Sequence, residues 1–354
     1  MTPIAELLIR RIQATGPITL ADYMAECLLH PEYGYYSTRD PFGAAGDFTT
    51  APEISQMFGE LLGLCLAQTW LDQGAPARFT LAELGPGRGT LMADVLRATK
   101  RVAGFHAAAQ VLLVEASATL RARQRATLGD YPVQWADQLT LGETPLYLLA
   151  NEFFDALPIR QFTRHGQGWE ETLIGVTNHR LSLGKSPPSQ ISPLDHRLAD
   201  TKPGDIVEIC PAAAPIMQTI AAQIETHGGA ALILDYGDWT SRGDTFQALK
   251  AHSFTDPIAE PGEADLTAHV DFAALAAACT SHACTSHAYT TQGQLLTALG
   301  IHQRAVQLGL KLTGDALVQH NAATHRLTAP EEMGKLFKAL AITPSHAPKP
   351  PGFA

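Results

Sequence analysis

Basic residues are scarce in this sequence relative to acidic ones, and long apolar runs are missing. The chain of 354 residues has 25 Lys and Arg against 35 Asp and Glu, a formal net charge of −10. Binding nucleic acid over a broad surface needs an excess of basic side chains, so that function becomes a minority hypothesis. No apolar run approaches the roughly 18 residues of a membrane-spanning helix, so we expect no integral membrane segment.

Cysteines are also few, and the five present are scattered along the chain. Secreted scaffolds held by disulfides are short and cysteine-rich, so this usage favours free thiols in a reducing compartment. The first residues place Glu6 ahead of Arg10 and contain no hydrophobic core, unlike a secretory signal, and they are too acidic for a typical transit peptide. The sequence therefore predicts a cytoplasmic location.

Short apolar runs alternate with helical patterns through the middle of the chain. Strands that are apolar on both faces and are joined by helices indicate a parallel sheet with helices on each side. We therefore predict an α/β fold with a doubly wound, mostly parallel sheet. Strands are expected at 79–84, 110–115, 133–135, 146–150 and 230–235, and helices at 89–103, 117–128 and 213–227.

Changes in pattern suggest how the rest of the chain is divided. Residues 1–72 are expected to form N-terminal helices and a long loop, which ends in a capping box of Thr50 and Glu53. The core is predicted at 73–159 and 204–240, a β-meander insertion at 160–203, a helical insertion with the C-terminal completion of the core at 241–340, and a disordered tail at 341–354.

A strand that ends in an acid and runs into a glycine-rich turn is the strongest signal. Glu83 precedes glycines at 85, 87 and 89, and a helical pattern follows at once. Gly85, Gly87 and Gly89 let the backbone approach a ligand closely, and the helix start presents free amides. Thr90 stands where a nicotinamide fingerprint needs glycine. A carboxylate at Glu83 would repel a pyrophosphate but suits a cationic or zwitterionic ligand.

A second acid, Glu115, ends the next predicted strand, where it can accept both hydroxyls of a ribose. Together the two acids and the glycine turn favour a class I methyltransferase that binds S-adenosylmethionine. The alternative is a tight strand–helix turn for the glycines and a surface acid for Glu115. By analogy with that fold, Trp135, Ala136 and Asp137 are candidates to contact the adenine.

The fourth predicted strand runs into Asn151, Glu152 and Asp155 at the edge of the sheet where ligands bind. Enzymes that methylate neutral amide-type nitrogens often carry two prolines here, which this chain replaces. Carboxylates suit a cationic guanidinium, which they can hold in bidentate fashion. We therefore predict that Glu152 and Asp155 orient an arginine, with Asn151 beside them. The alternative is that both acids cap the next helix.

A tandem repeat of Ala-Cys-Thr-Ser-His begins at Ala278 and yields four residues that could bind zinc. They are Cys279, His282, Cys284 and His287. Structural zinc sites usually hold each close ligand pair on a tight turn, and no Gly, Pro or Asn supplies one here. We interpret the repeat as a local duplication and expect no metal.

Four segments together resemble the MidA family of S-adenosylmethionine-dependent methyltransferases. They are residues 46–60, 83–92, 151–158 and 265–272. The resemblance implies a Rossmann-like class I methyltransferase core with an N-terminal lid and two insertions. For the mitochondrial member it implies symmetric dimethylation of an arginine in a quinone-module subunit of respiratory complex I. A bacterial-type member is then expected to act on the corresponding subunit.

The same resemblance implies roles for residues outside the core. Asp47 and Glu53 are expected to lie over the cofactor or substrate. His269 is expected to act as a general base, with a scaffold role as the alternative, and Asp271 to cap the helix that begins at Phe272. We therefore predict a protein arginine methyltransferase that uses no metal. The rival hypotheses are a small-molecule methyltransferase and an assembly chaperone that binds S-adenosylmethionine without catalysis; the oligomeric state stays open.

Overall fold

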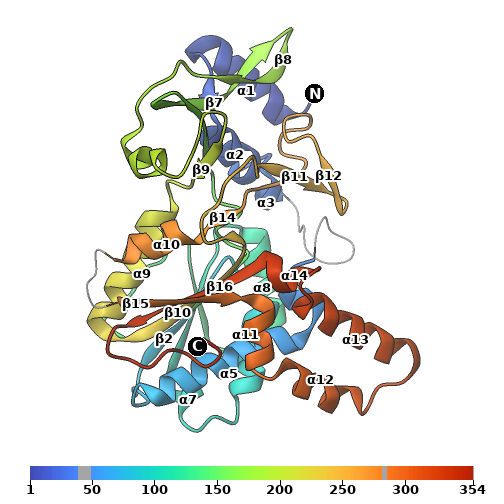
Figure 1. The fold of residues 1–354 in the computed structure, drawn as a ribbon. Helices are drawn as coiled ribbons and strands as arrows, with labels where there is room; N and C mark the ends of the chain where they lie inside the picture. The colour runs from blue at the N-terminus through green and yellow to red at the C-terminus, as the bar shows by residue number, and fades with distance from the viewer. Residues whose placement is uncertain (39–48, 281–284, 354) are drawn as a thin grey trace. The chain divides into compact units, whose positions relative to one another are not determined.

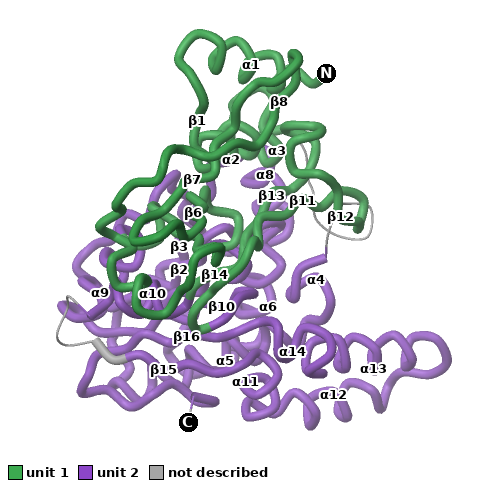
Figure 2. The backbone as a smooth tube through the Cα atoms, turned by 45° about the horizontal axis from the view of Figure 1, so that its top comes forward, with its two compact units in different colours: residues 1–48, 155–214, 239–271 green, residues 49–154, 215–238, 272–354 purple. Residues whose placement is uncertain are grey.

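The computed structural model describes residues 1–38, 49–280 and 285–353, without the side chains of residues 285 and 286. The chain forms two compact units, each assembled from three segments (Figure 2). Unit 1, in green, comprises Met1–Phe48, Asp155–Ala214 and Trp239–Asp271; unit 2, in purple, comprises Thr49–Phe154, Pro215–Asp238 and Phe272–Ala354. The predicted boundaries at 159, 204 and 240 divide the chain differently, because contacts made far along the chain decide which segments pack together.

Unit 2 is built on a twisted sheet whose strands lie in the order β15-β16-β10-β5-β2-β3-β4 (Figure 1). The five strands from β10 to β4 are parallel, and β16 is antiparallel to both its neighbours. The prediction of a mostly parallel α/β sheet is confirmed. The strands are β2 (Phe79–Leu84), β3 (Ala109–Val114), β4 (Val133–Ala136), β5 (Leu146–Asn151), β10 (Gly229–Asp238), β15 (Thr285–Thr291) and β16 (Phe337–Pro344).

The helices of unit 2 lie before, between and after these strands. They are α4 (Ala51–Ile54), α5 (Gln56–Asp72), α6 (Thr90–Thr99), α7 (Phe105–Ala108), α8 (Ala118–Leu128), α9 (Ala213–His227, whose first two residues are assigned to unit 1), α10 (Phe272–Cys279), α11 (Gln292–Ala298), α12 (Ile301–Gly309), α13 (Gly314–Thr328) and α14 (Met333–Leu336).

Two glycines on α5 bring α6 close to it. A Cβ at Gly59 would lie 2.6 Å from Cβ of Asp94, and one at Gly63 would lie 2.9 Å from Cα of Val95. No other residue type fits such a close helix contact without displacing the neighbour. The contact fixes α6, whose first residue follows the glycine turn, against the apolar core of unit 2.

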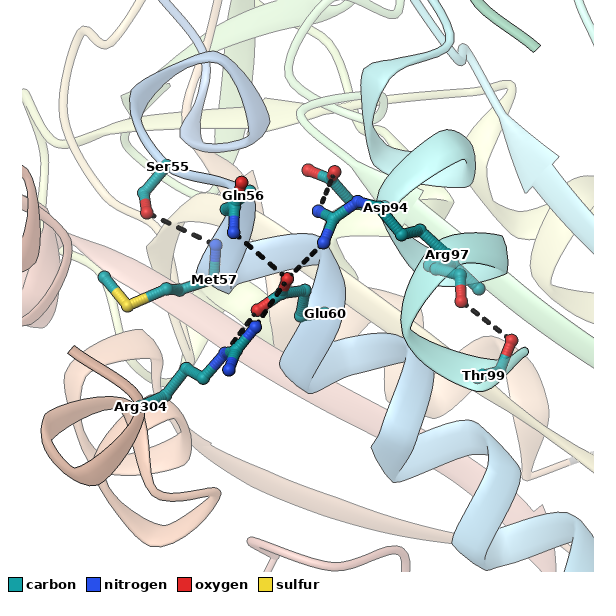
Figure 3. Close-up of polar contacts among 9 residues, drawn as sticks. Ser55, Gln56, Met57, Glu60, Asp94, Arg97, Thr99 and Arg304 are labelled. Atoms are coloured by element: carbon teal, nitrogen blue, oxygen red, sulfur yellow. Dashed lines mark hydrogen bonds and ion pairs between the residues drawn. The ribbon is translucent and has the colours of Figure 1, made fainter. Parts of the chain in front are cut away.

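A buried carboxylate on α5 joins α6 to α12 (Figure 3). Glu60 forms ion pairs with Arg97 of α6 and with Arg304 of α12, the second with Nε to Oε2 at 2.8 Å. Burial alone would raise the pKa of Glu60, but hydrogen bonds from the two guanidinium groups outweigh it and hold the pKa below its usual range.

The α12–α13 hairpin extends from the rest of unit 2 and exposes Val306 and Leu310 (Figures 1 and 2).

Unit 1 combines antiparallel strands with the N-terminal helices. Its larger sheet has the order β1-β7-β6-β9, with β8 paired to β7, and a smaller sheet has the order β12-β11-β13. The antiparallel run of β6, β7 and β8 agrees with the predicted β-meander. The elements are α1 (Pro3–Thr15), β1 (Ile18–Thr19), α2 (Leu20–Leu29), α3 (Tyr35–Thr38), β6 (Arg160–His165), β7 (Gly168–Thr177), β8 (Arg180–Lys185), η1 (Ser192–Leu198), β9 (Ile206–Ile209), β11 (Gln247–Lys250), β12 (Ser253–Thr255), β13 (Asp265–Thr267) and β14 (Val270–Asp271).

Three local predictions were wrong. The tail is ordered, because Phe353 is 5% exposed in the core of unit 2 and Cys65 Sγ donates to the carbonyl of Pro351. Residues 247–267 hold three strands where helices were expected. The predicted capping box does not form: Thr50 makes no side-chain cap, the Glu53 side chain accepts from Thr90, and the next helix is capped by Ser55. Among the described residues, no helix has the length and apolar character to cross a membrane.

Candidate active site

The glycine turn lies at the carboxyl end of β2, in the middle of the parallel sheet. Gly85, Gly87 and Gly89 have φ values of +59°, +50° and +83°, a region that side chains with a Cβ rarely adopt. Gly89 immediately precedes α6 and offers no side chain to its first amides. The turn therefore places no side chain of its own over the start of α6, and its predicted contact with a ligand stays a prediction.

Neighbouring residues pack tightly on this turn. A Cβ at Gly85 would lie 3.0 Å from the Phe153 ring, and one at Gly89 would lie 3.3 Å from Cα of Gln124. The turn is thus held between the end of β5 and helix α8. A larger residue at either glycine would have to move one of these elements.

Gly89→Ala is expected to destabilise the protein by about 1–2 kcal/mol, because alanine is strained at this φ, and to weaken cofactor binding at least tenfold by shifting α8. Gly74→Ala is the matched control, since Gly74 has φ +87° and no described atom within 4 Å of its Cβ position. Urea unfolding and titration calorimetry measure both quantities. Equal losses of affinity in the two variants would contradict a binding role for the turn.

The carboxyl group of Glu83 is buried beneath the turn. It is 3% exposed, and no described residue donates a hydrogen bond to Oε2. Burial raises the pKa of Glu83 to about 8, Glu115 adds to the increase, and the Met92 backbone N–H opposes it. A buried acid with a vacant acceptor atom suits a cationic group of a ligand.

Glu115 follows β3, on the strand next to Glu83. Its Oε1 accepts from the backbone N–H of Ser117 at 2.8 Å and its Oε2 from Nε2 of Gln124 at 3.2 Å. Burial raises the pKa of this carboxyl group, and these donors oppose it. Asp137 instead forms an ion pair with Arg121 at 2.6 Å, with its side chain 80% exposed. A contact between Asp137 and the adenine stays a prediction.

Glu152 lies in a strained turn at the carboxyl end of β5. Its φ is +49°, and its Oε1 accepts from the backbone N–H of Ala51 and from Nδ2 of Asn151, both at 3.1 Å. Asn151 Oδ1 is buried, and no described residue donates to it. A non-glycine residue in this conformation costs of order 1–3 kcal/mol and is common at functional sites.

Asp235, within β10 near its carboxyl end, holds the backbone that follows Glu152. Its side chain is fully buried, and Oδ2 accepts from the backbone N–H groups of Phe153 and Phe154 at 3.2 and 3.0 Å. The Phe153 ring in turn lies against Gly85. Asp235 therefore connects the Glu152 turn to the glycine turn.

Glu53 contacts the same helix start. Its Oε1 accepts from the hydroxyl of Thr90 at 2.5 Å, and its Oε2 lies 3.9 Å from Nη1 of Arg88. These contacts place Glu53 beside the glycine turn, although its predicted role over a ligand stays a prediction. Asp47 lies outside the described residues.

The other predicted residues belong to unit 1. Asp155 is buried, and its carbonyl accepts from the backbone N–H of Ala268 at 3.0 Å. The backbone N–H of His269 donates to the hydroxyl of Thr245, which itself donates to the buried Glu208. Asp271 forms an ion pair with Arg197 at 3.5 Å. Catalytic roles for Asp155 and His269 stay predictions.

The geometry agrees with what comparison with known proteins shows. A family model described as an S-adenosyl-L-methionine-dependent methyltransferase matches residues 61–290. The chain belongs to this methyltransferase family. The resemblance to the MidA family is thereby confirmed, and S-adenosylmethionine is the cofactor on which the family depends.

Relatives of this methyltransferase match almost its full length. Protein arginine methyltransferase NDUFAF7, mitochondrial, from Xenopus tropicalis is 37% identical, over 95% of this chain and 85% of that protein. The human protein of the same name is 34% identical, over 97% and 84%. A crystal structure from Burkholderia thailandensis, bound to S-adenosyl-homocysteine, has a TM-score of 0.86 and 28% identity, over 99% of this chain and 94% of that one.

Sequence reasoning missed one residue of this methyltransferase that joins the elements of the site. Gln124 lies on α8, a polar helix in which no pattern distinguishes it. Asp235 in β10 was open to two interpretations from the sequence, a polar contact near the pocket or a turn, and the structure shows that it makes polar contacts. In the duplicated segment, His282 and Cys284 lie outside the described residues.

Proposed function

We propose that this methyltransferase transfers the methyl group of S-adenosylmethionine to an arginine guanidinium of a protein. The names of its relatives support arginine as the target. The observation that carries the proposal is the strained Glu152, whose turn packs through Phe153 on the glycine turn. A carboxylate held there can bind a guanidinium beside the cofactor.

The residues of unit 2 fit the cofactor. The vacant acceptor of Glu83 suits its ammonium group, the glycine turn gives close backbone approach, and Glu115 suits its ribose hydroxyls. The cofactor supplies a methyl group already activated by a sulfonium. The protein therefore has mainly to position the two reactants.

Glu152 is assigned two tasks. Its carboxylate holds the guanidinium by charge-assisted hydrogen bonds and directs one nitrogen toward the methyl carbon. As the nitrogen–carbon bond forms and the carbon–sulfur bond breaks, that nitrogen loses a proton, which the carboxylate accepts. Asn151 and Ala51 hold the carboxylate through Oε1.

The resemblance to the MidA family supports a quinone-module subunit of respiratory complex I as the substrate. The rival hypotheses are a metabolite substrate and a non-catalytic assembly role. The first predicts that a metabolite receives the methyl group, and the second predicts that no methyl group is transferred.

Labelled S-adenosylmethionine and complex I from a strain lacking this gene test the proposal directly. We expect label on an arginine of one quinone-module subunit, detected by peptide mass spectrometry. Label in the metabolite fraction alone would favour a small-molecule enzyme. No transfer, together with complex assembly restored by Glu152→Gln, would favour a chaperone.

A further inference from the structure

The side chain of Gln124 contacts three separate parts of the cofactor site described above. It is fully buried on α8. Its Nε2 donates to the carbonyl of Gly87 at 2.8 Å and to Oε2 of Glu115 at 3.2 Å, and its Oε1 accepts from Nε1 of Trp135 at 2.8 Å. One carboxamide therefore joins the glycine turn, the end of β3 and strand β4.

The orientation of this carboxamide is determined by its partners. The Gly87 carbonyl and the Glu115 carboxylate can only accept, whereas the Trp135 indole can only donate. The reverse orientation of the amide would face acceptors with its oxygen and a donor with its nitrogen. All three hydrogen bonds form in one arrangement only.

This arrangement fixes the Glu115 carboxylate at both oxygens. Oε1 is held by the Ser117 backbone and Oε2 by Gln124. The Ala116 backbone also hydrogen-bonds this carboxylate, so of its roughly four acceptor positions about one stays available for a ribose hydroxyl. Arg125 lies over the Trp135 ring at 4.7 Å, which helps to hold the indole in place.

We propose that Gln124 is a positioning residue for the cofactor, which holds the Gly87 turn and the Glu115 carboxylate in the geometry that receives the adenosine half. The inference rests on the proposed function, because it assigns Glu115 to the ribose. Gln124 acts through these two groups and does not touch the reacting atoms.

The test compares two ligands by titration calorimetry with the full-length protein. S-adenosyl-homocysteine contains both halves of the cofactor, and 5′-methylthioadenosine lacks the amino acid. Gln124→Met keeps the volume and removes the hydrogen bonds, so both ligands should bind more weakly by the same factor, about tenfold to a hundredfold. Glu83→Gln should weaken S-adenosyl-homocysteine only.

A second variant gives a readout that a purely structural role would not change. In Gln124→Glu, a carboxyl group faces the Gly87 carbonyl and the Glu115 carboxylate, so it can hydrogen-bond to either of these acceptors only when protonated. Affinity for 5′-methylthioadenosine, which does not reach Glu83, should therefore approach that of the wild type at about pH 5.5 and fall steadily toward about pH 7.5. The wild-type affinity for 5′-methylthioadenosine should stay nearly constant over this range.

Gln292→Met is the matched control, because Gln292 is also fully buried in unit 2 and donates to the carbonyl of Leu327. It should lower the melting temperature without changing affinity. The inference is overturned if Gln124→Met binds both ligands as the wild type does, or if the affinity of Gln124→Glu for 5′-methylthioadenosine does not depend on pH. If the wild type binds neither ligand, the proposed cofactor site fails, and this inference with it.

Discussion

Glu152→Gln is expected to reduce kcat for arginine methylation by about 100- to 1,000-fold, since it removes one preorganised charge from the reacting nitrogen. Glutamine keeps an oxygen that can accept from Ala51 and Asn151, so the turn should survive. The affinity for S-adenosylmethionine should stay within about threefold of the wild type. Initial rates with a saturating peptide from the substrate subunit measure the effect.

Glu143→Gln is the control for this variant. Glu143 is exposed and precedes β5, at the amino end of the same strand, so its loss should leave kcat unchanged. A Glu152→Gln enzyme with a wild-type kcat would rule out the assigned role. A parallel fall in cofactor affinity would instead assign Glu152 to cofactor binding.

Binding of S-adenosyl-homocysteine is expected to release a proton below about pH 8, because Glu83 is protonated in the free protein and ionised beside the ligand's ammonium group. The pKa of Glu83 in the free protein is about 8, raised by burial and then by Glu115. Affinity should therefore rise by as much as about tenfold per pH unit between about pH 5.5 and 7.5. Calorimetry in buffers of different ionisation enthalpy measures the proton count.

Two comparisons isolate Glu83 in this experiment. Glu83→Gln should bind weakly and release no proton, and 5′-methylthioadenosine should release none from the wild type. A pH-independent wild-type affinity for S-adenosyl-homocysteine would show that Glu83 does not meet the ammonium group.

The folded-state pKa of Glu83 is raised, so the contribution of this group to the free energy of unfolding is complete below about pH 4.5 and is lost as the pH rises through about 8. Glu83→Gln should remove that part of the pH dependence of the unfolding free energy.

The parts of the site that could be predicted from the sequence are local. Glu83 and the glycines occur within one strand–turn–helix, where residue spacing determines which atoms share an edge of the sheet. The strain at Glu152 could not be predicted, because the residues that follow it are held by Asp235, which is distant in sequence. The role of Gln124 was equally hidden, since a polar residue on a polar helix is usually exposed.

The C-terminal tail, residues 341–354, also could not be predicted from its own sequence. Its prolines predict disorder, but one aromatic side chain, Phe353, finds a place in the apolar core of unit 2. Whether such a place exists depends on α5 and α11, and the tail sequence carries no information about them. Long-range packing decided the outcome.

The α12–α13 hairpin resembles an appendage that could be exchanged between relatives or deleted (Figure 1). The ion pairs of Glu60 make the hairpin difficult to delete. Arg304 in the hairpin neutralises the Glu60 carboxylate, which also pairs with Arg97 on α6, the helix that follows the glycine turn. Ile301 and Leu327, near the two ends of the hairpin, belong to the core as well. A shortened chain would need a new residue at position 60 and new apolar cover, so this part of the protein is expected to evolve by substitution rather than by deletion.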